Sequence, residues 1–232
     1  MVDIVMDAPG KNALGTGLMT WLLGQIRGAG DEPILLTGTG DAFSAGLNLR
    51  EVSALEADGM HAFLDTLEEL CVVLYTHPAP VVAAVNGHAI AGGAVIAACC
   101  DVRVCTTSPR ARIGLNEVAL GLRFPPAILR IVRARVAPRH LEEVLLGAAL
   151  YDPEGAARVG LVDAVAADPV AVGRERLAAL AALPRHAYAV TKADLRGDVS
   201  STADEKRRFA EDVLPLWTSE ELRARIRAIL SR

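Results

Sequence analysis

Residues 80–95 read PVVAAVNGHAIAGGAV, an apolar strand pattern followed by a turn and a run of small residues. The strand is expected over residues 81–85 and ends at Asn86-Gly87, which is typical of a tight turn. A helix of small side chains is expected to begin near Gly92-Gly93. Small residues let a ligand approach backbone N–H groups, and a helix N-terminus favours negative charge. Two such N–H groups directed at one oxygen would form an oxyanion hole.

A second glycine-containing segment, GDAFSAGLNL, occupies residues 40–49 and also follows an expected strand. Neither segment contains G-x-G-x-x-G or G-x-x-x-x-G-K-[ST], so the sequence indicates neither a dinucleotide site nor a P-loop. On these residues alone an alternative stays open, in which Gly92-Gly93 only allows a helix to pack closely.

The rest of the chain alternates strand and helix patterns up to about residue 170. Strands are expected over 3–6, 33–37, 81–85, 102–105 and 161–165, and helices over 14–26, 59–76 and 138–146. Such alternation predicts an α/β fold with mainly buried sheets. Helical patterns alone follow, over 170–183, 187–195, 201–214 and 219–230. We therefore expect a core over residues 1–169 and a helical appendage over 170–232.

Composition narrows the function classes. The chain has 232 residues, of which 52% are hydrophobic, and a net charge of -4 with no basic run interleaved with aromatics, which argues against nucleic acid as a partner. Four cysteines show neither C-x-x-C spacing nor a histidine partner, so we expect buried free thiols and no metal site. The N-terminus lacks a signal-peptide pattern, and the longest apolar stretch is too short to span a bilayer. We expect a cytoplasmic protein with no membrane partner.

Five segments, in this order, resemble the crotonase superfamily over nearly the whole chain: PGKNAL at 9–14, FSAGLNL at 43–49, residues 80–94, IGLNE at 113–117 and GAARVGLV at 155–162. The resemblance implies a spiral of strand-strand-helix units with a C-terminal helical trimerisation region. It also implies an acyl-coenzyme A thioester as ligand, whose carbonyl oxygen is held by the backbone N–H groups of Leu47 and Gly92.

Carboxylates decide which member of the superfamily the chain is most similar to. Hydratases of the family carry one glutamate three residues after the oxyanion-hole glycine and another in a later motif. Here the first position is Val95 and the second is Glu117. Adding water to a double bond usually needs two poised carboxylates, whereas one glutamate suffices to move a proton from C2 to C4. The motifs therefore look most like those of 3-enoyl-CoA to 2-enoyl-CoA isomerases.

This chain departs from patterns found in the family at Pro125, at Asn48 and over residues 123–126. Dienoyl-CoA isomerases and 3-hydroxyacyl-CoA hydrolases carry aspartate eight residues beyond the glutamate, where this chain has Pro125. Asn48 stands where the family usually has aspartate, which affects the local turn rather than the Leu47 amide. Arg123-Phe124-Pro125-Pro126 replaces a glycine-rich stretch of hydratases, so an unusual acyl pocket is expected.

The resemblance thus assigns Glu117 as the acid/base, with Leu47 and Gly92 as oxyanion donors. Residues expected to contact the substrate are Lys11, Ala45, Leu49, Gly93, Val95 and Asn116. Asn116 could equally be a turn or cap residue. No metal or redox cofactor is implied, because coenzyme A is part of the substrate. Two alternatives stay open: hydration or another crotonase chemistry, and a non-catalytic acyl-CoA-binding protein.

The C-terminal helices carry the last expectation. Short amphipathic helices need a surface on which to bury their apolar stripes, so we expect self-association into a homotrimer or hexamer. The candidate contact residues are Leu214, Leu216, Trp217, Leu222, Ile226 and Leu230. Lys192, Lys206 and Arg207 either reach the coenzyme A phosphates or form a solvated face.

Overall fold

The structure is a computed structural model that describes residues 1–231. Its strands are β1 Val2–Met6, β2 Ile34–Gly38, β3 Ala42–Ser44, β4 Val81–Val85, β5 His88–Ile90, β6 Val102–Thr106, β7 Ile113–Gly114 and β8 Ala164–Ala166. Its helices are α1 Pro9–Asn12, α2 Thr16–Gly28, α3 Leu49–Ala54, α4 Ala57–Thr76, α5 Gly92–Cys99, α6 Glu117–Leu120, α7 Pro126–Arg135, the 3₁₀ turn Pro138–His140, α8 Leu141–Gly147, α9 Pro153–Arg158, α10 Pro169–Ala181, α11 Arg185–Arg196, α12 Ala203–Asp212, α13 Leu214–Trp217 and α14 Glu220–Leu230.

Two parallel sheets form the centre of the molecule. The larger has the order β1-β2-β4-β6-β8 and the smaller the order β3-β5-β7. From β2 onward the chain gives one strand to the larger sheet, one to the smaller, and then turns into helix, so it winds as a spiral of strand-strand-helix units. Gly87 makes one of these switches possible, because a Cβ there would collide with the backbone of Asp41.

The α/β class expected from the sequence is confirmed, with differences in detail, among them the helices α3, α7 and α9, which were not predicted. The strand expected over residues 161–165 is β8, and it begins at Ala164. The N–H groups of Leu161 and Val162 both donate to the Ala156 carbonyl and close the turn after α9. The strands of the smaller sheet were not predicted from the residue pattern, although the strand-strand-helix units implied by the family resemblance include a second strand in each unit. These strands have only two or three residues, too few to produce a recognisable alternation.

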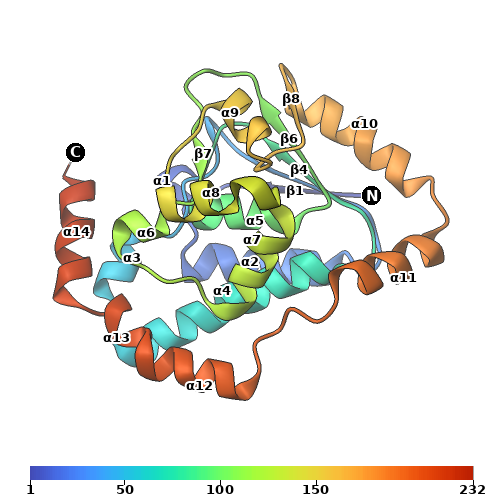
Figure 1. Ribbon diagram of the computed structural model, residues 1–232. Coiled ribbons are helices and arrows are strands. Elements are labelled where there is room, and N and C mark those ends of the chain that lie inside the picture. The colour runs from blue at the N-terminus through green and yellow to red at the C-terminus, as the bar shows by residue number, and fades with distance from the viewer. Residues whose placement is uncertain (232) are drawn as a thin grey trace.

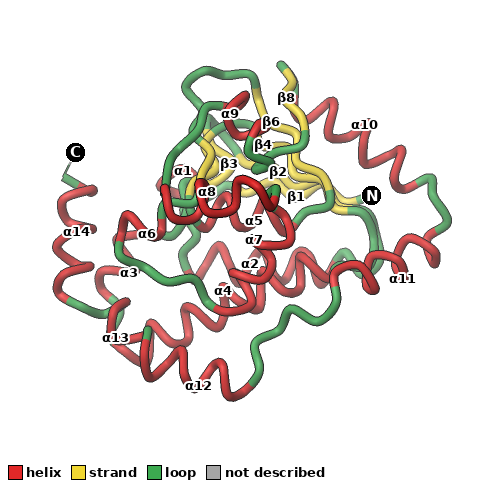
Figure 2. Tube along the Cα trace, in the orientation of Figure 1, coloured by secondary structure: helices red, strands yellow, loops and turns green. Residues whose placement is uncertain are grey.

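Helices cover both faces of the larger sheet. Figure 2 shows the strands gathered in one half of the molecule, with α2, α4, α5 and α7 below them. The other face is covered by α10, where Leu177 packs on Leu35, Val82 and Ala84. α10 therefore shares the core of residues 1–169, and the division of the chain at residue 170 stays a prediction. The helices α11 to α14 continue along the lower edge of the molecule in Figure 1 and end beside α3 and α6.

Candidate active site

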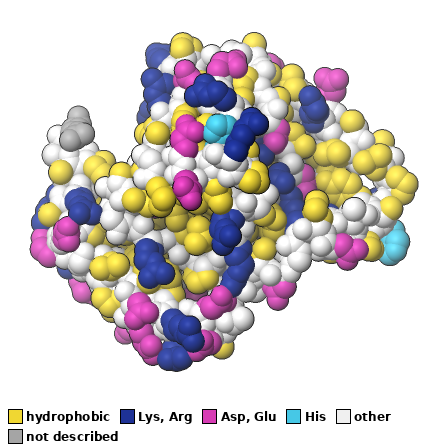
Figure 3. All heavy atoms as spheres, in the orientation of Figure 1, with side chains coloured by type: hydrophobic (Ala, Val, Ile, Leu, Met, Phe, Trp, Pro, Cys, Tyr) yellow, Lys and Arg dark blue, Asp and Glu magenta, His cyan; other side chains and the backbone are white. Residues whose placement is uncertain are grey.

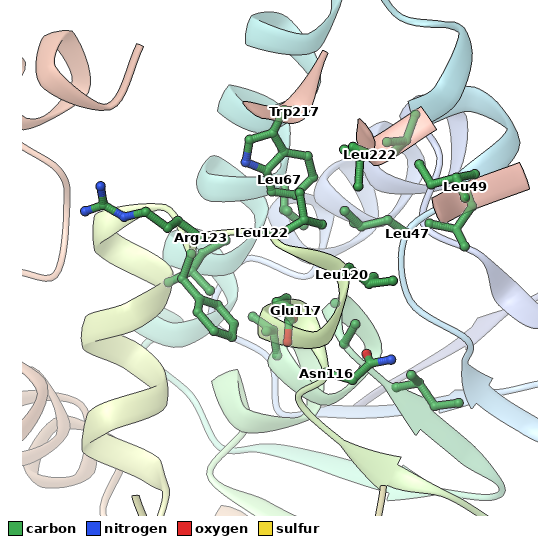
Figure 4. Close-up of a pocket in the computed structure, with 18 of the residues that line it drawn as sticks. Leu47, Leu49, Leu67, Asn116, Glu117, Leu120, Leu122, Arg123, Trp217 and Leu222 are labelled. Carbon is green, nitrogen blue, oxygen red and sulfur yellow. The ribbon is translucent and has the colours of Figure 1, made fainter. Parts of the chain in front are cut away.

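A cavity of about 250 Å³ lies between the first turn of α5, helix α6 and the two last helices, α13 and α14 (Figure 4). Its wall is mostly apolar. The described residues that line it are Ala45, Leu47, Leu49, Val52, Leu67, Ile90, Ala91, Gly92, Val95, Asn116, Glu117, Leu120, Leu122, Arg123, Phe124, Pro125, Ile128, Leu150, Trp217, Leu222, Ile226 and Ile229. A cavity of this kind, with a few polar groups in an apolar wall, is the usual form of a small-molecule site.

The backbone beside Leu47 leaves its amide free. Leu14 donates its N–H to the Gly46 carbonyl at 2.7 Å and accepts from the N–H of Asn48 at 3.0 Å, so the pairing skips Leu47. The N–H of Leu47 donates no hydrogen bond among the described residues. Leu47 lines the cavity, so this unpaired N–H is a candidate donor to a ligand.

A second amide group faces the cavity from α5. Gly92 is the first residue of this helix, so its N–H has no partner within the helix. Ala91 before it has φ +47°, which turns the chain sharply from β5 into α5. The two glycine segments touch here, since a Cβ at Gly92 would lie 3.2 Å from the Leu47 side chain and one at Gly46 would lie 2.6 Å from the Ile90 carbonyl. Close packing and unpaired amides therefore occur together. The two interpretations of Gly92-Gly93, close helix packing and amide donation to a ligand, are compatible.

Glu117 is the only carboxylic acid among the described residues that line the cavity. It is the first residue of α6 and is 8% exposed. Its Oε2 atom has no hydrogen-bond partner within residues 1–231. Burial raises the pKa of Glu117 to about 8, because an apolar wall disfavours the ionised form. Figure 4 shows its side chain among leucines, with Trp217 and Leu222 across the pocket from Asn116.

Four of the expected substrate contacts line the same cavity: Ala45, Leu49, Val95 and Asn116. Val95 is fully buried in the wall. Asn116 precedes α6 but forms no capping hydrogen bond, and its Oδ1 atom has no partner in the described part of the chain, so the cap role considered for it is not found. Asn48, in contrast, caps α3 by accepting a hydrogen bond from the Glu51 N–H, which is how an aspartate would also act there.

Two expected contacts lie outside the cavity wall. Gly93 packs against the backbone of Ser44 in β3, so its small size serves the contact between α5 and the smaller sheet. Lys11 is exposed and forms an ion pair with Asp41 at 2.8 Å. Neither residue touches the cavity in this structure.

Trp217, Leu222 and Ile226 were expected at a contact between subunits, and this expectation is corrected for them. All three are buried within the chain, where they close one side of the cavity. The i, i+4 spacing of Leu222 and Ile226 indicates an apolar face but cannot tell which surface covers it. Leu216 and Leu230 are exposed, as a contact between subunits requires.

The basic residues considered for coenzyme A phosphates are all engaged in ion pairs. Lys192 is buried, where its Nζ atom donates to the Asp101 carboxylate at 2.7 Å and to the Ala79 carbonyl at 3.0 Å. It is therefore neither solvated nor free, contrary to both expectations. Lys206 lies 3.4 Å from Asp65, while Arg207 pairs with Asp204 and Glu211 on its own helix, the solvated face expected as the alternative.

Comparisons with known proteins agree on the family. A family model described as enoyl-CoA hydratase/isomerase matches residues 1–225. Enoyl-CoA delta isomerase 1 of mouse mitochondria is 33% identical over 179 residues, covering 76% of this chain and 61% of that protein. A probable enoyl-CoA hydratase of Mycobacterium tuberculosis is 31% identical over 200 residues, covering 84% of this chain and 77% of that protein. The match thus spans about three fifths of the mouse relative's length.

A solved structure extends the likeness to the whole fold. The crystal structure of human mitochondrial delta3-delta2-enoyl-CoA isomerase superimposes with a TM-score of 0.86 at 27% identity, covering 98% of this chain and 92% of that one. In residues 1–231, no helix combines the length and the apolar character that crossing a bilayer requires.

Proposed function

Because the chain belongs to the enoyl-CoA hydratase/isomerase family, we propose that it moves the double bond of a 3-enoyl-CoA thioester to the 2-position. The substrate's thioester oxygen accepts hydrogen bonds from the N–H groups of Leu47 and Gly92. Its acyl chain lies in the apolar cavity, beside Glu117.

The reaction is a proton transfer within the substrate. Glu117, ionised, removes the proton at C2, and the electron pair of the C–H bond delocalises into a dienolate whose oxygen is held by the two amides. The same carboxyl group then returns the proton to C4, and the double bond ends between C2 and C3. Substrate and product are isomers, so no oxidant, reductant or metal is part of the proposal, and coenzyme A leaves unchanged.

The observation that supports isomerisation most strongly is the single carboxylate. Among the described residues lining the cavity, valine rather than a second acid stands at position 95, and Glu117 alone can carry a proton. A pKa of about 8 suits one group that must act first as base and then as acid near neutral pH.

Replacing Glu117 by glutamine tests the proposal. Glu117→Gln keeps the shape of the side chain but cannot accept the C2 proton, so we expect kcat on 3-enoyl-CoA to fall about 10²- to 10⁴-fold while acyl-CoA binding is retained. Glu175→Gln, an exposed glutamate on α10, is the matched control. Near-normal turnover by Glu117→Gln would eliminate the single-base mechanism.

Hydration is the second candidate, because one relative is named a probable enoyl-CoA hydratase. Assays with 3-enoyl-CoA and with 2-enoyl-CoA as substrates, and with buffer alone as the blank, separate isomerisation, hydration and binding without turnover. Isomerisation without hydration supports the proposal, hydration at a comparable rate replaces it, and binding without turnover would make the chain a non-catalytic acyl-CoA-binding protein.

A further inference from the structure

The helix that carries Glu117 is too short to be stable on its own. α6 has four residues and ends in a Schellman motif, in which left-handed Gly121 donates its N–H to the Val118 carbonyl at 3.0 Å and Leu122 donates to the Glu117 carbonyl at 2.9 Å. One turn of helix is unstable without tertiary support. The motif also leaves the carbonyl of Leu120 without a partner of its own.

Arg225 of α14 supplies that partner. Its Nη1 atom donates to the Leu120 carbonyl at 2.9 Å, while Nη2 donates to Glu221 one turn earlier on its own helix at 2.7 Å. The guanidinium lies directly over Gly121, where an added Cβ would collide with it. Glycine at position 121 therefore serves the left-handed turn and also makes room for Arg225.

The same helix covers the cavity from the neighbouring turn. Leu222 and Ile226, on either side of Arg225 in sequence, are buried in the cavity wall. α14 thus has one face that excludes water from the pocket and one side chain that holds the end of α6. Losing the hydrogen bond from Arg225 to the Leu120 carbonyl would let α6 move and would admit water beside Glu117.

We propose that Arg225 is a positioning residue for Glu117, which it holds in place by binding the end of α6 and by keeping α14 closed over the cavity. The proposal rests on the proposed function, since it assumes that Glu117 is the acid/base. Arg225 itself touches neither the cavity nor the reacting atoms. Its effect on the reaction passes through the position and the hydration of Glu117.

Few charged groups lie on the elements packed around α6. Arg123 comes from the segment before α7 and Arg225 from α14, while α8, which contacts α6, carries exposed Glu142 and Glu143. Burial, rather than any of these charges, is what raises the pKa of Glu117. Admitting water should therefore move that pKa down, toward the ordinary value of 4.5.

Three variants test the proposal in the full chain. Arg225→Ala removes the donor, and Arg225→Lys keeps one donor that can reach the Leu120 carbonyl. Arg227→Ala is the control, because Arg227 lies on the same helix, is exposed and, among the described residues, forms an ion pair with Glu220 alone. Each is examined by steady-state kinetics, by thermal unfolding, and by infrared titration of the Glu117 carboxyl against the Glu117→Gln background.

In Arg225→Ala we expect kcat to fall about 10- to 100-fold, with a much smaller change in KM. The titration of Glu117 should move to lower pH. Arg225→Lys should recover part of both changes, and it decides the matter if the alanine variant does not fold. Arg227→Ala should match the wild type.

The inference is overturned if Glu117 titrates in the Arg225 variants as in the wild type, if kcat is unchanged, or if Arg227→Ala loses as much. The proposed function fails separately, when the wild type itself does not isomerise 3-enoyl-CoA. Even then, the titration of Glu117 in the Arg225 variants decides whether Arg225 controls its environment.

Discussion

The burial of Glu117 disfavours its ionised form and so affects the stability of the fold, while the raised pKa that results suits proton transfer. An apolar wall gives the carboxyl a pKa of about 8, against 4.5 for an ordinary glutamate. The folded protein therefore binds this proton more tightly than the unfolded chain does. The free energy of unfolding that Glu117 contributes is present in full below pH 4.5 and is lost progressively as the pH rises to about 8.

Glu117→Gln should remove this pH dependence. A shift from 4.5 to about 8 corresponds to at most about 5 kcal/mol between the two limits. We expect the wild type to lose stability between pH 5 and 8, and the variant to be less sensitive over this range and more stable than wild type at pH 8. Urea unfolding at both pH values measures this, with Glu175→Gln as control. Parallel pH profiles for wild type and Glu117→Gln would show that the carboxyl is hydrated.

At this scale the sequence predicted the catalytic candidates better than their surroundings. The resemblance to the crotonase superfamily picked out Leu47, Gly92, Glu117 and Val95 position by position, and all four line one cavity. Trp217 could not be assigned in this way. Its place in the wall depends on where a helix far along the chain packs, which no local pattern encodes.

The secondary-structure elements also differ in how well the sequence predicts them. β2 and β4 are fully buried and mainly apolar, and α4 has a continuous apolar stripe, so both kinds of element could be predicted from the sequence. β3, β5 and β7 were missed because pairing, rather than side-chain pattern, makes them strands. The four-residue α6 is held by the Gly121 turn and Arg225, both outside its own sequence.

Helix α11 is attached to the body mainly through charge. Lys192 is its one buried residue, and the Asp101 carboxylate accepts from Lys192 at 2.7 Å and from Arg196 at 2.6 Å. Asp101 also accepts from the Val81 N–H at 2.6 Å. Burial lowers the pKa of Lys192 to about 8. The charges of Lys192 and Arg196 are thus both balanced by the Asp101 carboxylate.

Asp101→Asn should release α11. The amide keeps the size of the side chain but leaves two buried cations without a counter-charge, which typically costs about 3–5 kcal/mol. We expect a lower melting temperature and earlier proteolysis within residues 185–196. Asp194→Asn, an exposed position on α11 itself, should change neither measurement. Equal stability of Asp101→Asn and wild type would mean that apolar contacts hold this helix.

For the whole molecule, the C-terminal region has two distinct parts. α13 and α14 complete the cavity of their own chain. α10 and α11 border a hollow of about 490 Å³ that includes Leu180, Leu183, Tyr188 and Leu195. Figure 3 shows hydrophobic side chains gathered on this side of the molecule. An apolar surface of this kind on a protein indicates an interaction site.

We expect this surface to be covered by a second copy of the chain, in a closed assembly with a trimer as the minimum. Leu195 is 83% exposed, so within one chain it stabilises almost nothing. Leu195→Glu should therefore leave the melting of an isolated subunit unchanged while placing a charge where an apolar contact is required. Light scattering should give a trimer or hexamer for the wild type and smaller species for Leu195→Glu, with Glu175→Gln unchanged. A wild type that is a monodisperse, active monomer at micromolar concentration would refute the assembly.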